Sequence, residues 1–362
     1  MRVLVVGAGI AGLALARALG RSGITAEVVE RGTAEQSGGA GLYLPANAVR
    51  ALGDLGIGTA VAARANPIRR QRILDHRGRV LADLDVERFW GGVGTCVAME
   101  RAALHEALRE ATAGVSVRLG VSATGLEDGD APRVAFSDGG TGSYDLVVGA
   151  DGIRSTVRSL AFDGPPARYL GQACWRFVAA GFPEVRDWTA MLGRGRTFLT
   201  VALGGGTVYG YADLDTADPS GVDREGWQES FRDFVDPVPR LLEASGEAYF
   251  APIEEVVAPA WTAGRVVLIG DAAHASSPNM AQGAAMAVED ALVLAELVAA
   301  RPVEEALAAY EERRRARVAW VQKQTHRRDR TRSLPPVVRN LTLRFAAERI
   351  FRSNYRPLLD RP

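Results

Sequence analysis

The sequence predicts an α/β protein in which a mostly antiparallel β-sheet interrupts a domain built on parallel strands. Three observations carry this prediction. Residues 2–30 show a short apolar strand pattern, a glycine-rich turn, a helix pattern and a second strand pattern. Residues 165–260 are rich in Gly and in aromatic residues that alternate with polar ones. Residues 265–300 then return to a buried strand followed by a long helix.

The first unit predicts two parallel strands. Arg2–Val6 is apolar and rich in β-branched residues, Leu13–Leu19 has the apolar spacing of a helix, and Ala26–Glu30 is the next strand. A helix that crosses over between two strands places them parallel in one sheet.

Helix and strand patterns continue along the chain. Further helices are predicted over residues 47–57, 101–113, 283–300, 303–330 and 336–352. Strands are predicted over residues 116–119, 134–137, 144–149 and 265–270, with an antiparallel hairpin over residues 68–85. We therefore expect a discontinuous α/β domain over residues 1–70, 96–165 and 260–300, a β-sheet domain over residues 71–95 and 166–259, and C-terminal helices over residues 301–362.

Bulk composition excludes several classes of protein. The chain has 362 residues, of which 47% are hydrophobic and 24% charged, so a disordered chain and a small disulfide scaffold are excluded. Its two cysteines form no CxxC pair, and its four histidines lie far apart without metal-ligand spacing, so no metal site is expected. The N-terminus begins at once with a strand pattern, and no apolar run reaches membrane-spanning length, which predicts a cytoplasmic protein without a membrane span.

Positive charge is distributed unevenly. The chain balances 43 basic against 43 acidic residues, and Lys323 is its only lysine, so residue type alone assigns no role to an individual arginine. Residues 301–362 carry 16 basic and 7 acidic residues, a net charge of +9. A basic tail can indicate a nucleic acid or an anionic membrane as partner. Apolar residues at helical intervals instead favour packing onto the acidic body, and no nucleic-acid partner is expected: Val337, Val338, Leu341, Phe345, Ile350 and Phe351.

The first motif with chemical meaning is the GxGxxG turn at Gly7, Gly9 and Gly12. These glycines permit a tight turn, close approach of a pyrophosphate, and close packing of helix on strand. Glu30 ends the following strand, where a carboxylate accepts hydrogen bonds from ribose hydroxyls. The segment predicts a dinucleotide site of the Rossmann type, and by itself does not distinguish NAD from FAD.

Two further motifs follow predicted strands. In the segment GADGIRSTVR, Asp151 and Gly152 make a turn and Ser155 can cap the next helix, so a simple capped turn is an equal alternative to a ligand site. In the segment GDAAHASSPNMAQGAAMAVEDA, Asp271 stands at the carboxyl end of a buried strand, where sheet ligands bind. For His274 we favour a loop histidine bonded to backbone.

Together, in this order and spacing, the three motifs resemble those of the single-component FAD-dependent aromatic hydroxylases, which include para-hydroxybenzoate hydroxylase. The resemblance extends from Met1 to about residue 330. It implies FAD as cofactor, NAD(P)H as transient reductant, and a flavin hydroperoxide that transfers oxygen to an aromatic or other electron-rich small molecule. It does not distinguish NADH from NADPH, name the substrate or define the oligomeric state.

The resemblance also implies roles for individual residues. It implies that the FAD pyrophosphate is bound by Gly7, Gly9, Ala11 and Gly12. The adenosine ribose would be bound by Glu30, with Arg31 adjacent. Arg101 would approach the FAD phosphates. The motif of Asp151 is associated with binding of both FAD and the nicotinamide cofactor. Gly270 and Asp271 would bind the ribityl region. The isoalloxazine ring would be lined by Pro278, Gly283, Ala284 and Ala285. Gly41, within the Gly39–Ala48 loop, meets the other edge of the flavin.

This sequence departs from its relatives at two places. Ala281 stands where relatives commonly have glycine, and Ala285 and Met286 stand where many have asparagine. An amide side-chain contact to the flavin is therefore not expected, whereas backbone contacts are. We expect neither the thioredoxin-like C-terminal domain of larger phenol hydroxylases nor the tryptophan signature of flavin halogenases.

The predicted β-sheet domain would cover the substrate over the flavin. Its candidate pocket residues are Arg176, Phe198, Tyr209 and Tyr211, with ordinary sheet packing as the alternative for each. Arg176 would suit an anionic or phenolate substrate. No catalytic base is assigned, because the cofactor carries the difficult chemistry. Two alternative functions remain at this point: a flavin-dependent reductase or dehydrogenase of the same fold, and a non-catalytic flavin-binding protein.

Overall fold

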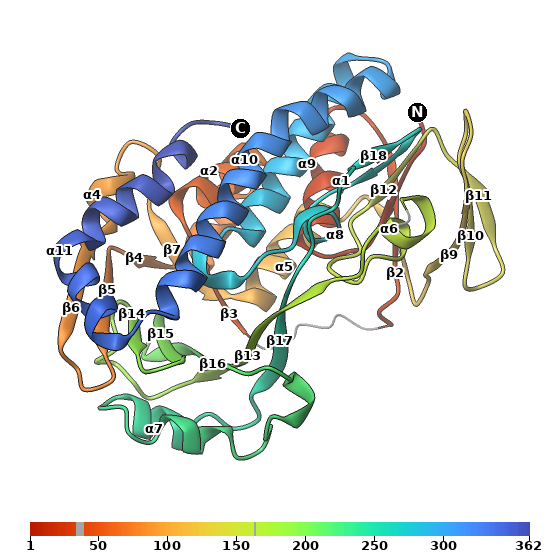
Figure 1. Cartoon of the computed structure of the whole chain (residues 1–362). Coiled ribbons are helices and arrows are strands. Elements are labelled where there is room, and N and C mark those ends of the chain that lie inside the picture. Colours follow the sequence, from red (N-terminus) through yellow and green to blue (C-terminus); the bar gives the residue numbers. More distant parts are fainter. Residues whose placement is uncertain (34–39, 163) are drawn as a thin grey trace.

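The computed structural model describes residues 1–33, 40–162 and 164–362. Figure 1 shows a small sheet of β9, β10 and β11 at one end of the molecule and a larger antiparallel sheet at the other, with long helices between them. No helix among the described residues is long and apolar enough to cross a membrane. The α/β fold with an inserted antiparallel sheet and C-terminal helices is confirmed.

A six-stranded sheet forms the centre of the first unit in the described chain. Its neighbouring strands run parallel, except that β18 is antiparallel to β19. Its central strands β1, β12 and β19 are entirely buried, as expected for a parallel sheet covered on both faces, whereas the edge strand β8 is mostly exposed. In spatial order they are β18 (Thr262–Ala263), β19 (Val266–Leu268), β12 (Leu146–Gly149), β1 (Val3–Val6), β2 (Ala26–Glu30) and β8 (Ser116–Leu119).

The second large sheet has seven strands in the described residues. It is antiparallel except for the pair β14 and β5, and the predicted hairpin of residues 68–85 forms its edge as β5 and β6. In spatial order the strands are β17 (Tyr249–Glu255), β13 (Arg168–Ala179), β16 (Thr207–Asp215), β15 (Arg196–Gly204), β14 (Trp188–Leu192), β5 (Arg70–Asp75) and β6 (Val80–Asp85).

Two small antiparallel sheets complete the strands. One is β11 (Thr141–Ser143), β10 (Arg133–Phe136) and β9 (Ala123–Glu127), and the other is β3 (Gly41–Leu44), β7 (Cys96–Glu100) and β4 (Asn66–Ile68). The second small sheet packs against β15 and β16 on one side and contacts α2 and α5, so it lies between the seven-stranded sheet and helices of the first unit.

Helices cover the sheets. Among them α9 packs against α1, α2 and α10 and lies in the middle of the molecule (Figure 1). The α-helices are α1 (Ile10–Arg21), α2 (Ala46–Asp54), α3 (Gly58–Arg64), α4 (Val86–Trp90), α5 (Arg101–Ala111), α6 (Thr156–Ala161), α7 (Val238–Glu243), α8 (Asp271–His274), α9 (Gly283–Ala300), α10 (Val303–Arg332) and α11 (Pro336–Tyr355).

The antiparallel sheet separates two hydrophobic cores. Because partners across an antiparallel pair share one face, Arg176, Tyr211 and Leu199 lie on the face toward the first unit. Trp175, Ala212 and Phe198 lie on the opposite face. That face packs on α7 and the segment Trp227–Phe231, forming a separate aromatic cluster.

The C-terminal helices correct one expectation. They do pack on the body, because α10 buries Arg314 completely and α11 buries Phe351 and Tyr355. However, most of the apolar residues that predicted this packing do not take part in it. The following α11 residues are exposed: Val337 (72%), Val338 (49%), Leu341 (49%) and Phe345 (86%).

Candidate cofactor and substrate site

Each glycine of the GxGxxG turn has a separate structural reason. Gly7 has φ +108°, and a Cβ there would lie 2.4 Å from the Ala150 carbonyl oxygen. A Cβ at Gly12 would lie 1.9 Å from the Gly7 oxygen, so only glycine lets α1 approach the turn. By contrast, a Cβ at Gly9 would have no neighbour within 4 Å. Gly9 therefore faces open space at the N-terminus of α1, where free amides attract a phosphate.

Glu30 lies beside this turn. Its two carboxylate oxygens accept hydrogen bonds from the amides of Ala8 and Gly32, each at 2.8 Å. Each oxygen keeps a further acceptor position for a ligand hydroxyl. Arg31 is exposed beside it.

His105 is a residue of this site that the sequence reasoning missed. Its Nε2 lies 2.8 Å from the Ala8 carbonyl oxygen, so in the donating tautomer it bonds the glycine turn. His105 stands four residues after Arg101 on α5, and residues with this spacing share a helix face. That spacing is the signal by which the sequence could have linked His105 to the arginine.

The start of β3 meets the antiparallel sheet. A Cβ on Gly41 would lie 2.4 Å from the Cβ and Cγ atoms of Tyr209, so the backbone passes directly against that ring. The Arg101 amide donates to the Ala40 oxygen at 2.8 Å, which places the start of α5 at the same loop. Gly39, the predicted first residue of the loop, lies outside the described residues.

Asp151 caps a helix. Its carboxylate accepts hydrogen bonds from Ser155 Oγ at 2.5 Å and from the amides of Thr156 at 2.7 Å and Val157 at 3.2 Å. Burial raises the pKa of Asp151, although these hydrogen bonds oppose the shift. Arg158 is buried and donates to the Ala272 oxygen at 2.8 Å, which ties this turn to α8.

Asp271 stands where the other motifs converge. Gly270, with φ +58°, begins α8, and a Cβ there would lie 3.0 Å from the Cβ of Ala11. This close approach joins the third motif to the glycine turn. Asp271 is exposed, and its Oδ1 lies 4.0 Å from the position of a Cβ on Gly283, at the start of α9.

The segment between α8 and α9 contains a left-handed alanine. Ala281 has φ +50°, a conformation that glycine adopts without strain. Glycine, which the family resemblance leads us to expect at this position, would adopt the conformation without strain. Pro278 is exposed and Ala284 is partly exposed, on either side of this turn.

A buried amide pair joins the Gly39–Ala48 loop to the start of α9. Asn47 Nδ2 donates to Gln282 Oε1 at 2.9 Å, and Gln282 Nε2 donates back to Asn47 Oδ1 at 3.2 Å. Asn47 also approaches Glu289 Oε1 at 3.4 Å. Sequence reasoning missed this pair, because its members are separated by 235 residues.

The prediction for His274 is wrong. Its Nε2 lies 2.7 Å from Asp290 Oδ2, so its partner is a buried carboxylate and not the backbone. The same Asp290 oxygen accepts the Gly270 amide at 2.9 Å, while Asp290 Oδ1 accepts Arg314 Nε at 2.7 Å. Arg314 also donates to Glu289 Oε2 at 2.8 Å. A buried charge network that reaches α10 thus holds the backbone of Gly270, the residue before Asp271.

The substrate-pocket prediction needs one correction. Phe198 is fully buried and packs against Phe177 and Phe231 in the aromatic cluster, on the sheet face directed away from the cofactor motifs. It therefore does not share a surface with Tyr209 and Tyr211.

Arg176, Tyr209 and Tyr211 do lie on one face of the sheet. Arg176 Cζ lies 5.8 Å from the centroid of the Tyr211 ring. Its Nε is buried and has no hydrogen-bond partner among the described residues, so a donor is left free on this face. Burial raises the pKa of Tyr209 to about 12 and that of Tyr211 well above its usual range, so both phenols stay protonated near neutral pH.

These residues fit a dinucleotide that carries a flat ring. The open space at Gly9 suits a pyrophosphate, and Glu30 keeps acceptor positions for a ribose. The start of α9 offers amides beside small side chains, where negative charge on a ring is stabilised. The described residues contain no group of His, Cys, Asp and Glu that could hold a metal ion.

Comparison with known proteins agrees with this geometry. A family model described as an FAD binding domain matches residues 1–188 and 208–325. The chain is 36% identical over 336 residues to a 2-heptyl-3-hydroxy-4(1H)-quinolone synthase of Pseudomonas aeruginosa, covering 90% of this chain and 88% of that protein. It is 35% identical over 346 residues to a 3-amino-4-hydroxybenzoate 2-monooxygenase of Streptomyces cremeus, covering 90% and 86%.

A solved structure is similar along the whole chain. The Klebsiella pneumoniae protein HpxO, complexed with FAD and uric acid, superposes with a TM-score of 0.92. It is 27% identical, and the match covers 100% of this chain and 97% of that one.

Proposed function

The chain belongs to the FAD-binding family of flavin-dependent aromatic hydroxylases, and from this premise we propose that it uses NAD(P)H and O₂ to hydroxylate or epoxidise an electron-rich aromatic small molecule. The chain is an FAD-dependent monooxygenase and therefore an oxidoreductase. The observation that carries the proposal is that Tyr209, beside Arg176 and Tyr211, packs against the loop of Gly41, next to the cofactor motifs.

Bound FAD supplies the redox chemistry, which takes two electrons from the nicotinamide and transfers one oxygen atom to the substrate. In the proposed balance, the substrate, O₂, NAD(P)H and a proton give the hydroxylated product, water and NAD(P)⁺. The protein's own residues bind, orient and exclude water. We assign no side chain as a catalytic base.

We propose the following positions for FAD, on the support of the contacts described above. The pyrophosphate lies at Gly7, Gly9, Ala11 and Gly12, with Arg101 nearby, and the adenosine ribose at Glu30 beside Arg31. The ribityl chain lies at Gly270 and Asp271, and the ring lies along Pro278, Gly283, Ala284 and Gly41. Asp151 is proposed to contribute to this site by fixing the turn before α6, whose first amides it binds.

The domain division is part of the proposal. Residues 1–70, 96–165 and 260–300 bind FAD, residues 71–95 and 166–259 cover the substrate, and residues 301–362 support both. A cytoplasmic location is proposed as well, because NAD(P)H is available there and because Cys96 and Cys174 are free thiols.

Arg176 is the proposed anchor for an acidic or phenolic group of the substrate. By their names, one of the relatives above makes a hydroxyquinolone and the other acts on an aminohydroxybenzoate, and HpxO holds uric acid. All are aromatic rings with polar substituents. A guanidinium donor left unpaired on an aromatic face suits such a ring.

A small-molecule screen tests the activity. The FAD-loaded protein is given NADH or NADPH with candidate aromatic compounds, while NAD(P)H oxidation, O₂ uptake and hydrogen peroxide are followed. We expect a coupled substrate to increase NAD(P)H oxidation and O₂ uptake equally, with little peroxide. NAD(P)H-driven turnover that proceeds without O₂ and yields a reduced product would show a reductase instead.

Asp271→Ala is expected to weaken FAD binding by about tenfold or more, because a side-chain acceptor for the cofactor is lost. Asp271 is exposed, so the fold is expected to tolerate the change. Titration of the apoprotein with FAD, followed by flavin fluorescence, measures the affinity. Asp271→Asn keeps the shape and is the matched control; unchanged affinity in Asp271→Ala would remove Asp271 from the cofactor site.

Arg176→Met is expected to raise KM for an anionic or phenolic substrate by about tenfold, the value of one charge-assisted hydrogen bond, with a smaller effect on kcat. Phe198→Leu is the matched control on the opposite face of the same sheet. It is expected to lower the melting temperature through lost packing and to leave KM unchanged. If Phe198→Leu raised KM as much as Arg176→Met, the assignment of the two faces would be wrong.

A further inference from the structure

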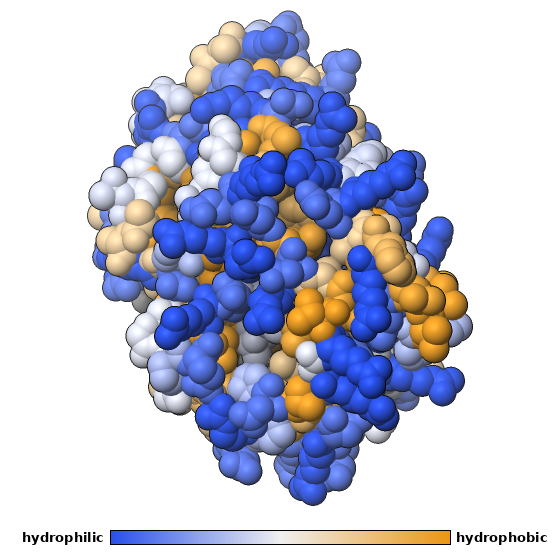
Figure 2. Space-filling view, turned by 90° about the vertical axis from the view of Figure 1, so that its left-hand side faces the viewer, coloured by the Kyte–Doolittle hydropathy of each residue, from blue (hydrophilic) through white to orange (hydrophobic). Residues whose placement is uncertain are grey.

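The outer face of α11 carries an unusual set of exposed apolar side chains. Leu334, just before the helix, is 38% exposed, and it continues the series of Val337, Val338, Leu341 and Phe345. The spacing of Leu334, Val338, Leu341 and Phe345 is four, three and four residues, which places them on one side of a helix. We call these five residues the α11 patch. Figure 2, which faces the side of the molecule where α11 lies, shows hydrophobic side chains gathered among hydrophilic ones.

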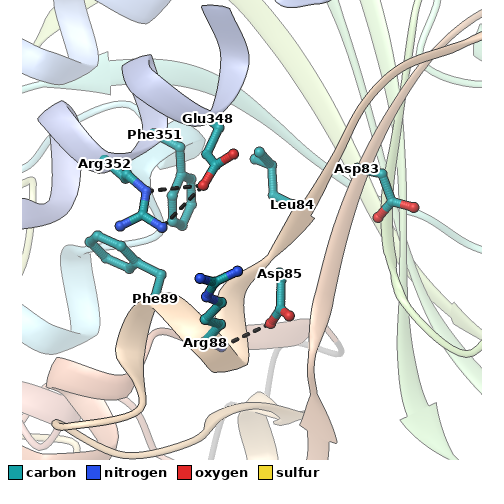
Figure 3. A pocket seen from close by; sticks show the side chains of 8 residues that line it. All are labelled: Asp83, Leu84, Asp85, Arg88, Phe89, Glu348, Phe351 and Arg352. Carbon is teal, nitrogen blue, oxygen red and sulfur yellow. Dashed lines mark hydrogen bonds and ion pairs between the residues drawn. The ribbon is translucent and has the colours of Figure 1, made fainter.

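The patch is not the result of a loosely attached helix. Near its start, Arg339 is buried and donates to the Gly193 oxygen at 2.7 Å. Near its end, the Phe351 ring lies 5.1 Å from the Phe89 ring in an edge contact. Figure 3 shows Phe89 and Phe351 beside Arg352 at a small cavity of about 130 Å³ between α4, β6 and α11. The inner face of α11 is therefore fixed on the body while the patch faces outward.

Exposed cations without acidic partners flank the patch along the chain. Arg330, Arg344 and Arg349 are exposed, and none of them forms an ion pair with any residue in ranges 1–33, 40–162 or 164–362. Arg352 is the exception, because Glu348 pairs with it at 3.0 Å. The patch thus combines an apolar centre with a positively charged border.

This charge pattern favours one occupant. A second copy docked patch to patch would bring the same cations close together, which is unfavourable. An anionic bilayer surface meets both features, because acyl chains accept the apolar side chains and lipid phosphates attract the arginines. We propose that α11 binds the surface of an anionic membrane, with its axis in the plane of the interface and without spanning the bilayer.

Vesicle co-sedimentation tests this with the FAD-loaded full-length protein. The probes are vesicles of phosphatidylcholine alone and vesicles containing about one-third phosphatidylglycerol. We expect the protein to bind the anionic vesicles more strongly than vesicles of phosphatidylcholine alone. Binding to the anionic vesicles should fall as the salt concentration rises to about 0.5 M. No substrate or NAD(P)H is present, so the result does not depend on the proposed reaction.

Three variants make the result specific to the patch. Leu341→Ser with Phe345→Ser is expected to lower the partition coefficient by about tenfold or more, because the two most apolar contacts are lost. Arg344→Glu with Arg349→Glu is expected to abolish the preference for anionic lipid. Val257→Ser, at a residue 55% exposed outside α11, is the matched control and is expected to bind normally. Flavin content and thermal unfolding confirm that each variant is folded.

Several results would overturn the proposal. These are no binding to either vesicle, binding that survives both patch variants, and binding that is independent of phosphatidylglycerol and salt. A dimer seen by light scattering that dissociates in Leu341→Ser with Phe345→Ser, without vesicle binding, would assign the patch to a second copy instead.

Discussion

Replacing Gly9 with valine is expected to give a folded protein that purifies without its yellow cofactor. The Cα of Gly9 faces open space, since a Cβ there would meet no atom within 4 Å. Its φ of −75° is accessible to any residue. A valine side chain therefore fits the protein itself but occupies the space proposed for the pyrophosphate. We expect FAD affinity to fall by about 100-fold or more, equivalent to about 3 kcal/mol.

Flavin absorbance per polypeptide, together with circular dichroism, checks this prediction. Gly20→Val is the matched control, because Gly20 is an exposed residue of the same helix and also has no neighbour within 4 Å. We expect it to retain FAD. Gly12→Val gives the opposite kind of failure, because its Cβ would lie 1.9 Å from the Gly7 oxygen and the fold itself would be disrupted. A yellow Gly9→Val protein with normal flavin content would place the phosphates elsewhere.

The helix of residues 283–300 and the glycine turn could be predicted from the sequence, because each depends on residues close together in the chain. The helix expected over residues 283–300 has those bounds in the structure, because small residues begin it and good helix formers, mostly apolar, continue it. The glycine turn could likewise be predicted from spacing alone, since close approach of a helix to a strand requires glycine at fixed positions.

Which face of an element finds a partner could not be predicted from periodicity. The spacing of apolar residues in α11 predicted a helix with one buried face, yet the buried face contains Arg339, Ala347 and Phe351. Similarly, Phe198 and Tyr211 both belong to alternating strands, and only the register between β15 and β16 shows that they face opposite sides. Such assignments depend on the pairing of distant segments.

Polar pairs between distant segments were also beyond the sequence. Asn47 and Gln282 pair across 235 residues, and His274 finds Asp290 on a helix that follows an intervening loop. No motif marks Arg314 among the 42 arginines, although its side chain is completely buried. Residues of this kind become visible only when burial and partners are known.

Arg314→Met is expected to lower the free energy of unfolding by about 3–5 kcal/mol, because it removes a buried cation from two buried carboxylates, leaving Arg317 beside Glu289 and His274 beside Asp290. In the native protein Arg314 bonds Asp290 at 2.7 Å and Glu289 at 2.8 Å, and neither carboxylate is exposed by more than 1%. Asp290 in turn holds the Gly270 amide beside Asp271. We therefore expect weaker FAD binding as well. Urea unfolding of the apoprotein and FAD titration measure the two effects separately.

The stability lost in Arg314→Met is expected to depend on pH through Asp290. Burial would raise the pKa of Asp290, but His274, Arg314 and the Gly270 amide lower it overall. A lowered pKa in the folded state contributes stability at neutral pH that is lost as the pH falls below the unfolded value of about 3.9. In Arg314→Met, burial destabilises the charged form of the Asp290 carboxylate, because the Arg314 cation no longer lies beside it. The stability deficit of Arg314→Met should thus be largest near neutral pH and shrink toward about pH 4, where a protonated carboxyl tolerates burial.

Arg313→Met is the matched control for this deficit. Arg313 is the neighbouring residue on α10, and its ion pair with Glu296 is solvent-exposed on both sides, so we expect a loss of about 1 kcal/mol or less. Equal losses for Arg313→Met and Arg314→Met would mean that burial does not set the strength of the Arg314 contacts. A deficit in Arg314→Met that is constant from neutral pH to about pH 4 would mean that losing Arg314 does not change the protonation of Asp290 over this range.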